Sequence, residues 1–164
     1  MTRGLALGLL GVLLVGTAPQ ALADSGPALN GRYQAVSNGD FAKTNDVYRD
    51  LPSVVSVWTI ESTCTDPQTC TGRVISDAGW EADLVFQTAT WKVRRELPDW
   101  QHCPDGTARP GYQLYRFFPM ADGEIVEGSP VLGGDDTTTG EPGACGVGYP
   151  VVITMPFRLV KLPT

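Results

Sequence analysis

The stretch VVSVWTIES, residues 54–62, decides the fold class of this chain. Successive side chains of an extended strand point to opposite faces, so Trp58 and Ile60 share one face while Val57 and Thr59 share the other. β-Branched and aromatic residues dominate the stretch, as they do in strands. The alternation therefore predicts a β-strand that buries one face.

Segments of the same kind lie on both sides of this stretch, separated by turn residues. The chain has 19 Gly and 13 Pro, which punctuate short runs of β-branched and aromatic residues. We expect strands over residues 31–37, 54–62, 72–76, 80–97, 112–118, 124–127 and 149–161, where 80–97 forms two strands or one long bent strand. Residues 135–148 are expected to form a long Gly-rich loop. The best candidate for a short helical turn is 40–48, with Asp40 as its cap.

This succession of short strands predicts an all-β protein. Seven or eight strands at such intervals favour an antiparallel β-barrel, with a β-sandwich as the alternative. Residues 24–164 are enough for a single domain around one hydrophobic core, and no repeat or linker divides them.

The first 23 residues have the pattern of a signal peptide. Arg3 supplies the positive charge, an apolar run follows over residues 5–15, and Ala-Leu-Ala at 21–23 is a cleavage site. The apolar run is too short to span a bilayer, which takes about 20 residues. We expect cleavage after Ala23 and a secreted chain, residues 24–164, without a transmembrane segment.

All four cysteines follow this leader. An even number of cysteines in a small exported domain predicts two disulfides, and four cysteines allow three pairings. We favour Cys64–Cys70 and Cys103–Cys145, because an Asp-Pro turn between the first two folds the chain back on itself. Neither pair has the Cys-x2-Cys spacing of zinc sites, so no metal is expected.

Charge and missing motifs narrow the function classes. The formal net charge is −6, whereas binding to nucleic acid or anionic lipid needs clustered Lys and Arg. No phosphate loop, dinucleotide fingerprint or Gly-x-Ser-x-Gly elbow is present. The single histidine, His102, leaves one base for a Ser-His pair. We therefore expect no nucleic-acid partner, no cofactor and no catalysis, with a hydrolase built around His102 as an alternative.

The aromatic residues suggest what a barrel could hold. A barrel of about eight strands can keep an interior site for one small ligand. The candidate ligand-binding residues are Tyr33, Trp58, Phe86, Trp91, Tyr115 and Arg158. The leading hypothesis is a non-catalytic module of the cell envelope or extracellular space, whose partner is a small apolar or amphipathic ligand or an envelope component. The alternative is a structural or interaction factor with an exposed aromatic patch that includes Trp80 and Trp100.

Two resemblances accompany this interpretation. Gly31-Arg32-Tyr33 with the late Arg158 resembles the lipocalin-like arrangement of Gly-x-Trp and an arginine that packs across it, with Tyr33 in place of Trp. A broader set of segments resembles a group of small exported mycobacterial proteins: 37–45, 58–60, Cys64 with 70–72, 76–80 and 155–159. This second resemblance implies an exported actinobacterial protein with disulfides and transfers no catalytic role.

Overall fold

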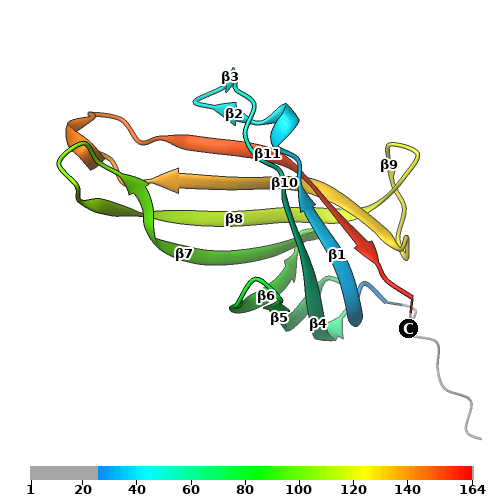
Figure 1. The fold of residues 1–164 in the computed structure, drawn as a ribbon. Coiled ribbons are helices and arrows are strands. Elements are labelled where there is room, and N and C mark those ends of the chain that lie inside the picture. Colours follow the sequence, from blue (N-terminus) through cyan, green and yellow to red (C-terminus); the bar gives the residue numbers. More distant parts are fainter. Residues whose placement is uncertain (1–25, 164) are drawn as a thin grey trace, which may run out of the picture.

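A computed structural model describes residues 26–163, in which eight antiparallel strands close into a barrel (Figure 1). The barrel closes because its first strand pairs with the second on one side and with the last on the other. In barrel order the strands are β1 (Gly31–Ser37), β4 (Val54–Asp66), β5 (Thr69–Ser76), β6 (Trp80–Gln87), β7 (Thr90–His102), β8 (Ala108–Ala121), β10 (Val131–Gly140) and β11 (Val152–Lys161). The predicted all-β barrel is confirmed over the sandwich. The predicted signal peptide lies outside the described residues.

Several short elements lie outside the eight strands of the barrel. A hairpin of β2 (Lys43–Thr44) and β3 (Val47–Tyr48) pairs with β11, and β9 (Glu124–Ile125) pairs with the end of β8. The two 3-10 turns are η1 (Gly39–Phe41) and η2 (Ala144–Gly146). The helical turn expected over 40–48 is wrong beyond η1, because the β2–β3 hairpin occupies the rest. Its cap is Asn38 and not Asp40, since the Asn38 side chain accepts a hydrogen bond from the Asp40 N–H at 3.1 Å.

The loop expected over 135–148 is wrong in its first half, where β10 pairs with both β8 and β11. Gly and Asp are poor strand formers, so the local sequence hides this strand. Packing against neighbouring strands explains the two residue types. Gly134 lies so close to the backbone of Arg116 that a Cβ would not fit, and the Asp136 side chain is 5% exposed inside the barrel.

A layer of aromatic side chains fills the middle of the barrel. Trp58 is 1% exposed and its ring lies 4.9–5.3 Å from the rings of Tyr115, Phe157 and Trp80. Ile60 is buried beside it while Thr59 is exposed, so the predicted alternation is confirmed over residues 58–62, whereas Val54 and Val55 are both exposed. Aromatic pairs in edge-to-face or tilted arrangements stabilise a core beyond the area that they bury.

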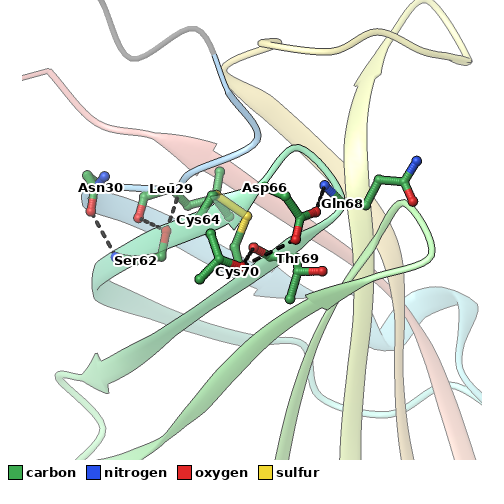
Figure 2. The surroundings of a disulfide bond; sticks show 9 residues. Leu29, Asn30, Ser62, Cys64, Asp66, Gln68, Thr69 and Cys70 are labelled. Carbon is green, nitrogen blue, oxygen red and sulfur yellow. Dashed lines mark hydrogen bonds between the residues drawn. A yellow bond between two sulfur atoms is a disulfide. The ribbon is translucent and has the colours of Figure 1, made fainter.

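The two ends of the barrel differ. At the extended end, the β7–β8 and β10–β11 connections lie side by side beyond the other strands (Figure 1), and the Cys103–Cys145 disulfide joins them. At the N-terminal end, where residues 27–30 enter β1, the Cys64–Cys70 disulfide joins directly opposed positions of β4 and β5 (Figure 2). Both favoured pairings are confirmed.

The N-terminal end is held by hydrogen bonds to the entering chain. Ser62 Oγ accepts from the Leu29 N–H at 2.7 Å and donates to the Leu29 carbonyl at 2.9 Å. The Asn30 side chain accepts from the Ser62 N–H at 2.9 Å, as Figure 2 shows. These bonds fix the chain to β4 before β1 begins.

Candidate functional site

A pocket of about 310 Å³ opens at the extended end, above the aromatic layer. Its lining comes from β4, β6, β7, β8, β10 and β11 and from the β5–β6 turn. The apolar walls are formed by Val54, Trp80, Leu97, Trp100, Ile153 and Met155. The polar groups are supplied by Arg95, Gln113, Tyr115 and Asp136. We call this site the mouth pocket.

A bulge in β7 positions one wall of the mouth pocket. The β7–β8 register shifts between Leu97 and Gln101, so extra residues on β7 face fewer on β8. The shift places the indole of Trp100 on Gly111, where an added Cβ would lie only 2.6 Å from Trp100 Cδ2. Because Gly111 has no side chain, the indole of Trp100 can lie directly against its backbone.

A gap between β6 and β7 gives the pocket another wall made of side chains. These strands pair only from Leu84↔Val93 to Gln87↔Thr90, so they separate toward the extended end. Trp80 and Arg95 lie in the gap, and the guanidinium carbon is 4.4 Å from the centroid of the Trp80 ring. At this distance the ring quadrupole attracts the cation.

Asp136 supplies a buried carboxylate to the mouth pocket. One carboxylate oxygen accepts a hydrogen bond from Ser37 Oγ at 2.7 Å and the other from Gln113 Nε2 at 2.8 Å. Burial raises the pKa of Asp136, and these two hydrogen bonds oppose that shift. Burial, together with the nearby Asp136 charge, also raises the pKa of Tyr115 well above its usual range.

Arg95 contrasts with Asp136 because its hydrogen-bonding capacity is not used. Its buried Nε and Nη1 atoms have no acceptor among the described residues. The ion pairs found in the described part of the chain, Arg73–Glu81 and Arg116–Asp135, do not include it. Burial lowers the pKa of Arg95, while the charges of Tyr115 and Asp136 oppose the shift. Most buried polar groups in proteins have a partner, so the two unpaired nitrogen atoms of Arg95 make the mouth pocket the candidate site of this barrel.

The six predicted ligand-binding residues do not gather in one place. Tyr33, Trp58, Phe86, Trp91 and Tyr115 are all buried in the barrel. Only Tyr115 among the six lines the mouth pocket, and the Trp58 layer lies beneath it. Phe86 lines a separate apolar hollow of about 440 Å³ at the N-terminal end, with Pro119 and Ile125.

Arg158 lies apart from the other five, exposed on the outer face of β11. It is opposite Val36 in the β1–β11 register. The cation nearest the Tyr33 ring is Lys161, whose Nζ lies 6.0 Å from the ring centroid. The lipocalin-like packing of Arg158 across Tyr33 is therefore not confirmed.

The sequence interpretation missed Arg95 and Asp136. A usable signal for Arg95 was its place between Val93 and Leu97 on the inward face of β7, where a charged side chain is unexpected. Asp136 had no such signal, because it was assigned to a loop.

The hydrolase alternative depends on His102. His102 is exposed at the end of β7, and no hydrogen bond joins it to a serine or a carboxylate there. Within residues 26–163, no three His, Cys, Asp or Glu side chains gather closely enough to hold a metal ion. No helix in the same range has the length and apolar character that crossing a bilayer requires.

Comparison with known proteins gives a match in fold. The sequence matches no protein-family model and no curated protein sequence. Among solved structures, the barrel is similar to the monomer form of the M. tuberculosis PknI sensor domain, with a TM-score of 0.60 and 18% sequence identity. The match covers 82% of this chain and 88% of the sensor domain. At this identity the likeness shows a shared fold.

Proposed function

We propose that this chain is an exported, non-catalytic binding module whose mouth pocket holds a small amphipathic ligand. The observation that carries the proposal is a pocket with apolar walls and a few polar groups, which lies above the packed aromatic layer of the barrel. Ligand pockets typically measure about 300–1,000 Å³ and combine apolar walls with a few placed polar groups. The mouth pocket lies at the small end of that range.

Three observations support export and binding over catalysis. Two disulfides fit an oxidising compartment outside the cytoplasm. The predicted signal peptide over residues 1–23 would deliver the chain there. The fold is similar to that of a sensor domain, which is a non-catalytic kind of module.

Native mass spectrometry of the protein purified from its host's culture medium tests the proposal. We expect the mass of residues 24–164 with both disulfides formed, plus an excess mass that organic extraction removes. Extracted protein should then rebind amphipathic probes and change its tryptophan fluorescence, because Trp80 and Trp100 line the pocket. A bare mass, together with no fluorescence response to any amphipathic probe, would overturn the proposal.

A surface-acting factor is the second candidate, favoured by exposed apolar side chains around the β2–β3 hairpin. Val47 is 64% exposed and Tyr48 is 70% exposed, on a strand that pairs with β2 at the end of the described strand order. Trp80 and Trp100 do not belong to this surface, because both are half-buried at the mouth pocket.

Cosedimentation with purified cell-envelope fragments of the host tests this second candidate. It predicts that the wild-type protein cosediments and that a Val47→Asp/Tyr48→Asp variant stays in solution. The ligand-binding proposal predicts no difference between the two proteins in this assay.

A further inference from the structure

We infer that the ligand of the mouth pocket carries an anionic oxygen head group, which Arg95 binds inside the barrel. The inference rests on the proposed function, because it names the chemistry of the same pocket. It follows from the charges that line the pocket and from the position of the guanidinium.

Arg95 has no ion-pair partner among residues 26–163, although the charge of Asp136 attracts it. Asp136 is the nearby acidic residue that lines the pocket, yet both of its oxygens already accept hydrogen bonds from Ser37 and Gln113. Burial also disfavours the charged form of Asp136, which weakens the compensation it offers to Arg95. A partly desolvated cation without a paired anion is costly. An anion brought by a ligand would offset that cost.

The guanidinium is also placed to recognise such a group. Trp80 covers one face of the guanidinium, which restricts its orientation. Its planar N–H groups match the geometry of a carboxylate or phosphate oxygen pair. The apolar side chains of Leu97, Ile153 and Met155 line the same pocket. A ligand would therefore place its head on Arg95 and its apolar part against these side chains.

The neighbouring Arg94 supplies a matched control. It lies on the same strand with the same charge, but its side chain is exposed because alternate positions of β7 face outward. Any general attraction between an anion and this acidic protein's few cations would involve Arg94 as much as Arg95.

The experiment titrates the mature protein, with both disulfides intact, against three probes in a calorimeter. The probes are octanoate, 1-octanol and octyltrimethylammonium, which share an apolar chain and differ in head-group charge. We expect octanoate to bind about 10-fold to 100-fold more tightly than 1-octanol, as for a hydrogen bond to a charged group, and the cation to bind most weakly. Arg95→Met should bind octanoate no better than 1-octanol, whereas Arg94→Met should match the wild type.

Each outcome separates the inference from the proposed function. If no probe binds the wild-type protein, the proposed function fails and the inference fails with it. If 1-octanol and octanoate bind equally well, the pocket binds ligands but the anionic head group is wrong. If Arg94→Met loses as much octanoate affinity as Arg95→Met, surface attraction explains the preference and the assignment to Arg95 is wrong. Arg95→Gln replaces Arg95→Met if the latter does not fold, and the wild-type comparison by itself decides whether the preferred head group is anionic.

Discussion

The two ends of the barrel are held together by different interactions. The N-terminal end is held by hydrogen bonds from Leu29 and Asn30 to Ser62 and by a disulfide within one hairpin. The extended end has a gap between β6 and β7, a bulge in β7 and a disulfide between two hairpins. Both ends have a hollow, but the wall of the mouth pocket is made by side chains where the strands separate, and these side chains bring polar groups among the apolar ones.

The largest expected effect comes from the layer that separates the two ends. Trp58→Ala removes the ring that contacts Tyr115 and Phe157, and leaves a cavity beneath the mouth pocket. We expect a loss of about 3–5 kcal/mol in the free energy of unfolding, measured by urea denaturation. Val55→Ala, on the outward face of the same strand, should change it by less than about 0.5 kcal/mol. Equal effects would contradict the description of a packed middle layer.

The two disulfides provide the next comparison. Cys103 and Cys145 are 42 positions apart, whereas Cys64 and Cys70 are 6 apart. On the loop-entropy model, closing a loop of about 43 residues stabilises the fold by about 4 kcal/mol and a loop of about 7 residues by about 2.4 kcal/mol. Replacing each pair by alanines should therefore cost more stability at the extended end. The reverse order in urea denaturation would show that local packing, and not loop closure, decides.

A smaller loss of stability is expected from a substitution at Gly111, against which Trp100 packs. Gly111→Ala places a methyl group against the indole, so we expect a loss of about 1–3 kcal/mol and weaker octanoate binding. Gly148→Ala is the matched control, because a Cβ there meets open space. Unchanged stability and binding in Gly111→Ala would mean that the position of Trp100 does not depend on the missing side chain at residue 111.

The smallest expected effect is a change in the free energy of unfolding with pH. The pKa of Asp136 is raised in the folded state, so the folded protein binds the proton more tightly than the unfolded chain. Protonation of Asp136 therefore contributes nothing to the free energy of unfolding at high pH. Its contribution increases as the pH falls through the folded-state pKa toward the ordinary value of 3.8. The free energy of unfolding of the wild type minus that of Asp136→Asn should rise as the pH is lowered from 7 to about 4. A difference that stays flat or falls would contradict the raised pKa of this carboxyl group.

The sequence predicted what depends on local pattern. The alternation of residues 54–62 marks β4, and the Asp-Pro turn between Cys64 and Cys70 marks the hairpin of β4 and β5. The sequence did not predict β10, because Gly134 and Asp136 become suitable strand residues only once β8 and β11 lie beside them. Local conformational preference gives way there to packing between distant segments.

The candidate site was predicted less well than the fold, for a related reason. Its polar residues come from different strands, and Ser37 and Asp136 are 99 positions apart although their side chains share a hydrogen bond. Of the predicted ligand-binding aromatic residues, all but Tyr115 lie away from the mouth pocket, since large apolar side chains stabilise a core best when fully buried. The bulge that places Trp100 depends on the β7–β8 register, which a single strand does not specify.

The gap between β6 and β7 has a consequence for solubility. Where these strands separate, each has an edge whose backbone groups are not paired by the other, and such edges can join strands of other molecules. The exposed side chains along these edges include charged ones, Glu81 and Asp83 on β6 and Arg94 and Glu96 on β7. Charges at strand edges are a common defence against edge-to-edge aggregation. The barrel can thus keep an opening in its wall without becoming a template for association.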